Sequence, residues 1–188
     1  MFFSVTGMAV EVEMQRLLTS AHIEKWIQDV FHFQWFLLLG LSIIALSMWW
    51  KLLNKVRLPE VLLYAVFTTI IMMGVDECGE ELTLWVYPIY LFPVFPVITA
   101  INLTSAILML SITHQCFTTW KSFSTATIVV SGLLAFILEP AFSFINLYQL
   151  LNWNYGYNFL LYVIVGLLVR GIVATLFSIA HNAQRDSN

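Results

Sequence analysis

Residues 31–50 read FHFQWFLLLGLSIIALSMWW and contain no formally charged side chain. As a helix these residues rise about 1.5 Å each and cover about 30 Å, the thickness of the hydrocarbon layer of a membrane. The whole chain has the same character, because 60% of its 188 residues are hydrophobic, 10% are charged and the mean hydropathy is +0.86. One water-soluble domain of this length cannot bury so much apolar surface. Lipid is therefore the predicted solvent for most of the chain.

Four more segments have the length and composition of membrane spans. Pro59 suits the first turn of the second helix, and about 20 residues carry that helix across the layer to Cys78. The sequence thus predicts an all-α, polytopic membrane protein with five transmembrane helices and an N-terminal amphipathic helix. The predicted membrane helices cover residues 31–50, 59–78, 93–117, 122–142 and 158–180.

The segment before the first span carries the amphipathic pattern. Between Met8 and Val30, apolar side chains recur at the i, i+3, i+4 spacing of one helical face, among acidic and basic ones. This pattern predicts a helix that lies on the membrane surface or docks to the bundle, and a plain extension of the first span is the alternative. The chain then divides into this amphipathic segment (1–30), the bundle (31–180) and a polar tail (181–188).

Basic residues predict an orientation. The loop between spans one and two, the loop between spans three and four, and the tail carry Lys or Arg, whereas residues 76–90 and 143–157 carry neither. The positive-inside rule puts the basic loops and the C-terminus in the cytoplasm and the N-terminus outside, although Arg16 and Lys25 oppose this orientation. The basic residues that decide it are Lys51, Lys55, Arg57, Lys121 and Arg185.

Composition also excludes several classes of protein. The formal net charge is −3 and the eight basic residues are scattered, so no basic stripe is available for a nucleic-acid backbone. Cys78 and Cys116 form no CxxC pair and have no histidine at ligand spacing, which argues against a disulfide framework or a zinc site. His114 is expected to be a hydrogen-bonded histidine near a membrane interface. No catalytic set is recognisable, so an enzyme ranks behind the non-enzymatic functions below.

The segment between the second and third spans, DECGEELTLWVYP (76–88), holds four of the eleven acidic residues. If the second helix continues through it, carboxylates four residues apart share a face and could bind a hard cation such as calcium or magnesium. A solvated cap that stops the helix from sinking into the membrane is the alternative. Because carboxylates oppose the dipole at a helix C-terminus, Gly79 is expected to end the helix and the later Glu pair to begin another turn.

Arg170 is the one charged residue of the fifth span and is predicted to lie near the middle of the bilayer, where a lone Arg costs about 2.5–3.5 kcal/mol. It should face the bundle interior and find an acceptor. Counting residues along the helices places Asp76, Asn102 and Glu139 in the outer half of the membrane, within reach of a long guanidinium stem. One buried polar cluster is therefore expected, which either serves a ligand or ion or only fixes the register of the helices.

Two functions follow from this cluster. In the first, an integral membrane protein binds or passes a small solute or ion through an outward-facing pocket. In the second, a structural or accessory membrane subunit recruits a protein partner or lipid without transport; association with further copies of the chain is left open. The predicted pocket consists of Asp76, Glu81, Asn102, Glu139 and Arg170, with Trp85, Tyr87 and Trp153 as its aromatic rim.

Several of these motifs occur together in an uncharacterised family of small multi-pass membrane proteins of endospore-forming bacteria, which the chain resembles over about residues 30–170. The resemblance implies an integral protein of the bacterial cell membrane with about five helices. It implies nothing about activity, because no activity is established for the family. The chain departs from the family pattern at Asn102, where Asp is usual, and lacks prolines expected near Ile107 and Leu160. The shared motifs are Trp49-Trp50-Lys51-Leu52 with Arg57, the set Asp76, Gly79, Leu82, Trp85, Tyr87-Pro88, Trp120-Lys121-Ser122-Phe123, Phe136 with Glu139-Pro140, and Asn152-Trp153.

Overall fold

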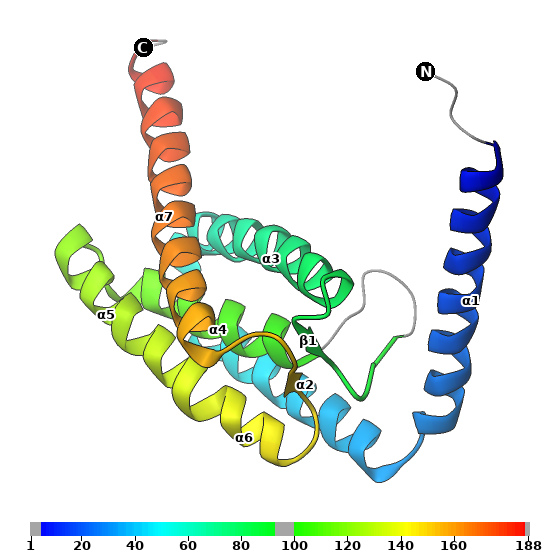
Figure 1. The fold of residues 1–188 in the computed structure, drawn as a ribbon. Coiled ribbons are helices and arrows are strands. Elements are labelled where there is room, and N and C mark those ends of the chain that lie inside the picture. Colours follow the sequence, from blue (N-terminus) through cyan, green and yellow to red (C-terminus); the bar gives the residue numbers. More distant parts are fainter. Residues whose placement is uncertain (1–4, 93–99, 187–188) are drawn as a thin grey trace.

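The structure is a computed structural model that describes residues 5–92 and 100–186 of the chain (Figure 1). Its described part is almost entirely helical, as predicted. The elements in chain order are α1 (Val5–Asp29), α2 (Phe33–Leu52), the 3-10 turn η1 (Lys55–Arg57), α3 (Leu58–Glu81), β1 (Trp85–Val86), α4 (Ala100–Cys116), α5 (Trp120–Leu133), the π turn η2 (Leu134–Leu138), α6 (Glu139–Phe144), β2 (Gln149–Leu150) and α7 (Tyr155–Asp186).

Four helical segments of the described chain are long and apolar enough to cross a membrane. They are Phe33–Leu52, Lys55–Glu81, Trp120–Phe144 and Tyr155–Arg185. The predicted third span is represented by a shorter apolar helix, Ala106–Cys116, so the count of five spans is not reached. The expected start of that span at Pro93 lies outside the described residues.

Connections gather at two opposite ends of the bundle. At the basic end, defined by residues 51–57 and 117–121, the backbone N–H of Asn54 donates to Gln115 Oε1 at 2.7 Å, and Gln115 Nε2 donates to the carbonyl of Leu52 at 3.0 Å. At the aromatic end, defined by residues 82–92 and 143–154, β1 and β2 pair antiparallel, with Trp85 opposite Leu150. Sequence patterns gave no sign of this short sheet, because two-residue strands have no periodicity to detect.

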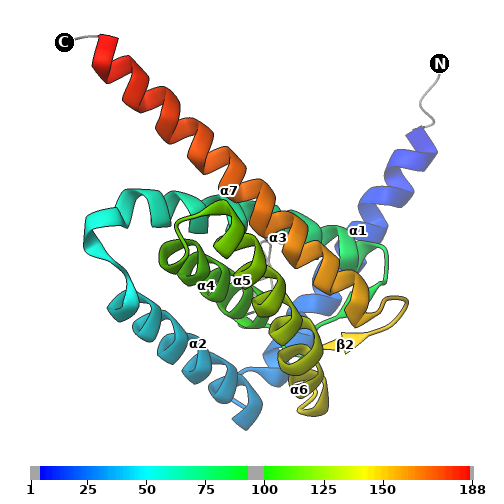
Figure 2. The same cartoon turned by 90° about the vertical axis from the view of Figure 1, so that its left-hand side faces the viewer.

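The core lies where α3, α4, α5 and α7 meet. It contains Tyr64, Leu110, Phe123 and Val169, each with an exposed fraction of 0%. α4 packs against both α2 and α3 (Figure 2), and the indole of Trp49 donates to the hydroxyl of Ser111 at 2.8 Å. Many side chains outside this core are large, apolar and exposed, as expected for helices that face lipid.

α3 does not end at Gly79, contrary to the expectation from sequence. The helix continues to Glu81, and Thr83 then takes the left-handed backbone conformation (φ 52°) that commonly closes a helix. The N–H of Leu84 donates to the carbonyl of Gly79 at 2.9 Å, which completes this closure. Gly79 has a different purpose, because a Cβ at this position would lie 1.9 Å from the indole of Trp85.

The fourth predicted span is one continuous helix made of α5, η2 and α6. Pro140 lies inside it, and a proline ring clashes with the carbonyl four residues earlier, here that of Phe136. The π turn includes Phe136, whose carbonyl would meet the proline ring in a regular α-helix. In this turn the N–H of Glu139 donates to the carbonyl of Leu134, five residues earlier. A single π turn inside an α-helix often marks a functional position. In this chain the turn ends at Glu139.

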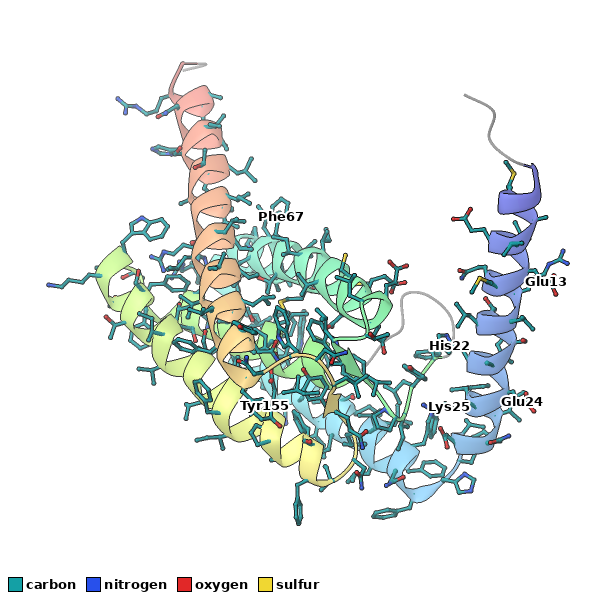
Figure 3. The ribbon with its side chains drawn as sticks, in the orientation of Figure 1. Glu13, His22, Glu24, Lys25, Phe67 and Tyr155 are labelled. Atoms are coloured by element: carbon teal, nitrogen blue, oxygen red, sulfur yellow. The ribbon has the colours of Figure 1, made fainter. Side chains whose placement is uncertain are left out.

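Two helices leave the bundle. α7 continues without a break into the predicted polar tail as far as Asp186, and every residue from 174 to 185 is exposed (Figures 1 and 2). α1 contacts the rest of the chain through its second half, where Lys25 Nζ lies 5.1 Å from the ring centre of Tyr90 and the indole of Trp26 donates to the carbonyl of Leu91 at 3.0 Å. His22 and Lys25 lie on the side of α1 that faces the bundle (Figure 3).

Candidate functional site

Glu139 is the centre of a buried hydrogen-bond network near the aromatic end. Its exposed fraction is 3%, because the π turn and α6 place its side chain against the start of α7. The amide of Asn158 donates to Glu139 Oε2 at 2.7 Å, and the hydroxyl of Tyr162 donates to Oε1 at 2.5 Å. Both carboxylate oxygens are thus held by neutral donors that lie one helical turn apart on α7.

Asn158 links this carboxylate to the aromatic loops. Its Nδ2 also lies 3.0 Å from the hydroxyl of Tyr148, and its Oδ1 accepts from the indole of Trp153 at 2.7 Å. All the hydrogen-bonding groups of this buried amide are therefore in use, which fixes its orientation. We call Glu139, Asn158, Tyr162, Tyr148 and Trp153 the Glu139 network.

Asp76 lies beside this network. The hydroxyl of Tyr87 donates to Asp76 Oδ1 at 3.0 Å, and the rings of Tyr87 and Tyr148 have centres 5.4 Å apart. Burial raises the pKa of Tyr87, and the nearby Asp76, Tyr148 and Tyr162 raise it further. Burial and then the charge of Glu139 raise the pKa of Tyr148, with a further contribution from Asp76. Both phenols stay protonated at neutral pH. The hydroxyl of Tyr87 donates to Asp76, whereas the hydroxyl oxygen of Tyr148 accepts from the amide of Asn158.

A second polar cluster occupies the basic end. Arg57 and Glu60 form a two-point ion pair, with Arg57 Nε 3.0 Å from Glu60 Oε2 and Arg57 Nη2 2.8 Å from Glu60 Oε1. His114, which is 2% exposed, places Nε2 3.1 Å from Glu60 Oε1 and stacks on the ring of Tyr64 with centres 4.3 Å apart. This cluster ties the start of α3 to the end of α4. The expectation of a hydrogen-bonded His114 is confirmed.

Arg170 lies at the basic end and not in the Glu139 network. The predicted pairing of Arg170 with Glu139 or Asp76 is therefore wrong. The predicted pairing with Asn102 stays a prediction, because the side chain of Asn102 lies outside the described residues. The guanidinium of Arg170 donates to the carbonyls of Phe117, at 2.6 Å, and Thr118. These carbonyls follow the last residue of α4, where a cation is favoured by the helix dipole. The guanidinium also lies over the rings of Phe123, at 4.2 Å, and Trp120, at 5.2 Å.

Replacing Arg170 by leucine should loosen the α4–α5 connection, because two charge-assisted hydrogen bonds to residues 117 and 118 are lost. We expect backbone amides of residues 117–121 to exchange with deuterium roughly tenfold faster in Arg170→Leu than in the parent chain. Arg185→Leu is the matched control, since Arg185 is exposed on the same helix beyond the bundle. Unchanged exchange in Arg170→Leu, or equal acceleration in both variants, would show that these bonds do not hold the loop.

The structure brings together part of the predicted pocket. Asp76 and Glu139 lie near each other with all three predicted rim residues, and the rings of Trp85 and Trp153 have centres 5.7 Å apart. Glu81 is exposed at the end of α3 and takes no part, and the side chain of Asn102 lies outside the described residues. The rim residues do not border an open pocket, because Trp85 and Tyr87 are buried in the aromatic end.

Sequence reasoning missed Asn158, Tyr162, Tyr148 and Glu60. A signal for two of them was present, because Asn158 and Tyr162 stand four residues apart and continue through Gly166 to Arg170, on one face of the helix. The role of Tyr148 could not be read in this way, because it lies in a loop without periodicity.

The described residues include no group of three His, Cys, Asp or Glu side chains that could hold a metal ion. The acidic residues at the end of α3 therefore do not form a ready cation site by themselves. No family model, no curated protein and no solved structure matches this chain.

Proposed function

We propose that this protein is an integral membrane protein that binds or passes a small cation, the proton included, at Glu139. The observation that carries the proposal is the set of partners of this carboxylate. Glu139 is almost fully buried, and within the described chain its hydrogen-bond partners are the neutral Asn158 and Tyr162. Neither described ion pair includes Glu139.

A carboxylate without a cationic partner is expensive to bury, so its charge must be balanced by a proton or a bound cation. Hydrogen bonds from Asn158 and Tyr162 favour the charged form, whereas burial favours the neutral form. The two influences oppose each other, which makes Glu139 suited to gaining and losing a positive ion. Ionisable residues within membrane segments commonly mark ion pathways and proton relays.

The arrangement of the helix ends supports five spans, with α4 as the third. β1 precedes α4 at the aromatic end, and the loop that follows α4 joins the basic end, so α4 must run between the two ends. With five spans and the basic end in the cytoplasm, the N-terminus and the Glu139 network face outward and the C-terminus lies inside. From the family resemblance we infer that the membrane is the bacterial cell membrane.

Carbodiimide labelling tests the proposal directly, because these reagents add to protonated carboxylic acids in apolar surroundings. For purified protein in lipid nanodiscs, we expect dicyclohexylcarbodiimide to modify Glu139, as located by peptide mass spectrometry, with labelling that falls as pH rises or as a bound cation is added. Glu139→Gln should lose this label, and Glu81, which is exposed, serves as the reference carboxylate. The labelling is measured over roughly two pH units on either side of neutral. If Glu139 is not labelled anywhere in this range, the proposal is refuted, since a carboxyl group that never takes up a proton cannot exchange one.

A specific observation favours the accessory role as the second candidate. The first half of α1 and roughly the last three turns of α7 lie away from the bundle and expose large apolar side chains, among them Leu17, Phe177 and Ile179. Such helices could recruit a protein partner or lie against lipid. A partner that co-purifies in a fixed ratio, together with an unreactive Glu139, would favour this role over ion binding.

A further inference from the structure

Three helices each carry a series of residues at every fourth position, most of them polar, and the three series face one another. On α7 the series begins at Asn158 in the Glu139 network and ends at Arg170 at the basic end. On α3 it joins Glu60 to Asp76, and on α5, η2 and α6 it leads to Glu139. We call the surface where they meet the polar seam. Its members are Asn158, Tyr162, Gly166 and Arg170 on α7; Glu60, Tyr64, Thr68, Met72 and Asp76 on α3; and Thr127, Ser131, Ala135 and Glu139 on the fourth span.

The three series are in contact at mid-seam. The hydroxyl of Tyr64 donates to the carbonyl of Gly166 at 3.1 Å. A Cβ at Gly166 would lie 2.8 Å from the methyl group of Thr127 and 3.5 Å from the hydroxyl of Tyr64. Glycine is thus what allows α3 and α5 to approach α7 at this point, and it brings the Thr127 side chain close to the Tyr64 hydroxyl.

Two hydroxyls of the seam are buried without a hydrogen bond. Thr127 and Ser131 both have an exposed fraction of 0%, and neither side-chain oxygen has a partner within the described chain. At the basic end, Nδ1 of the buried His114 likewise has no hydrogen-bond partner within the described chain. An unsatisfied buried polar group costs about 1–3 kcal/mol, and in native proteins such groups are commonly satisfied by internal water.

The order of these atoms along the seam indicates the course that a chain of waters would follow. Successive residues of a series are about 6 Å apart along the helix, a gap that one water with two hydrogen bonds can bridge. Glu139 and Ser131, which have the apolar Ala135 between them, are about 12 Å apart, so this step needs a short chain of waters. Starting from Glu139, the unsatisfied atoms follow as Ser131, Thr127 and, beyond the stacked ring of Tyr64, His114, which contacts Glu60. From Phe123 to Glu139 the fourth span rises about 24 Å, most of the thickness of the hydrocarbon layer.

We propose that the polar seam is a hydrated proton path that runs from Glu139, past Ser131, Thr127 and Tyr64, to His114 and Glu60 at the basic end. The proposal rests on the proposed function and names the proton as the ion. A metal cation needs several oxygen ligands at each stop, whereas the middle of the seam offers single hydroxyls. Each step moves one proton between oxygen or nitrogen atoms: Glu139 gives its proton to the water chain and takes another from the aromatic end. No electron transfer is involved, and a proton gradient drives the net flow.

Proteoliposomes loaded with a pH-sensitive dye test the path. A potassium gradient with valinomycin sets the membrane potential, and the internal pH is followed. We expect the parent chain to carry protons faster than empty vesicles, Glu139→Gln to abolish that flux, and Thr127→Val or Ser131→Ala to lower it roughly tenfold. Thr125→Val is the matched control, because Thr125 is an exposed threonine on the same helix. It should conduct like the parent chain.

The outcomes separate this inference from the proposed function. If Glu139 is labelled by carbodiimide but vesicles with the parent chain show no proton flux above empty ones, the path is wrong and Glu139 is only a binding site. If protons flow but Thr127→Val and Ser131→Ala both conduct like Thr125→Val, the path does not follow the seam. Elution as a single species with one cooperative thermal transition shows that each variant is folded. Tyr64→Phe, which removes one hydroxyl, gives an independent third test.

Discussion

Removal of the Glu139 side chain is expected to destabilise the protein more than any other single truncation near the aromatic end. In Glu139→Ala the hydroxyl of Tyr162 loses its acceptor, the amide of Asn158 loses one of two, and a cavity forms between α6 and α7. Together these effects should cost about 2–4 kcal/mol. For detergent-solubilised protein, this corresponds to a melting temperature lower by roughly 5–10 °C.

Glu139→Gln is the matched variant for this experiment. Its side chain has the same size, its carbonyl can accept one of the two hydrogen bonds, and its amide can donate to the hydroxyl of Tyr162. We expect less than half of the shift seen with alanine. Equal melting temperatures for Glu139→Ala and the parent chain would show that the network does not contribute to the fold.

Gly79→Ala should be the most disruptive single methyl addition in α3. The new Cβ would lie 1.9 Å from Cζ2 of Trp85, whose ring is rigid and 4% exposed. Because the indole cannot bend away, Trp85 and with it β1 must move. We expect a loss of about 3 kcal/mol, at the upper end of overpacking costs. Thermal unfolding measures the loss, and faster deuterium exchange at residues 85–87 locates it.

Gly74→Ala in the same helix is the control. No atom lies within 4 Å of a Cβ at Gly74, so the added methyl group meets open space. Alanine is the better helix former, and the variant should be as stable as the parent chain or more stable by up to about 1 kcal/mol. If both variants lose a similar amount of stability, the loss comes from adding a methyl group anywhere in the helix and not from the contact with Trp85.

The helices could be predicted from the sequence because their signal is local. Uncharged stretches such as 31–50 give the positions of α2, α3 and the helix made of α5, η2 and α6 to within a few residues, and Pro59 marks the start of α3. The end of α3 was misjudged because glycine was given its usual role as a helix stop, whereas Gly79 is required by a tertiary contact with Trp85. Contacts of that kind leave no periodic trace in a sequence.

The candidate site was predicted in part for a similar reason. Glu139, Asp76 and the rim aromatics were found because charge is rare in a membrane segment and aromatic residues gather at its borders. The error at Arg170 came from assuming that the fifth helix ends with its apolar stretch and crosses the bundle from end to end. α7 continues to Asp186, so Arg170 is level with the loop after α4, where backbone carbonyls serve as its acceptors.

The π turn makes the length of one segment as important as its composition. A π turn is an α turn with one residue more, so a shortening of residues 134–138 by a single residue would restore ordinary helix. Because the π turn accommodates its extra residue within about one helical turn, everything after it would keep nearly its present orientation. Glu139 would stay between the helices, but the ring of Pro140 would then meet the carbonyl of a regular α turn and clash with it. In this protein the extra residue is what lets the buried acid and the proline that follows it share one unbroken helix.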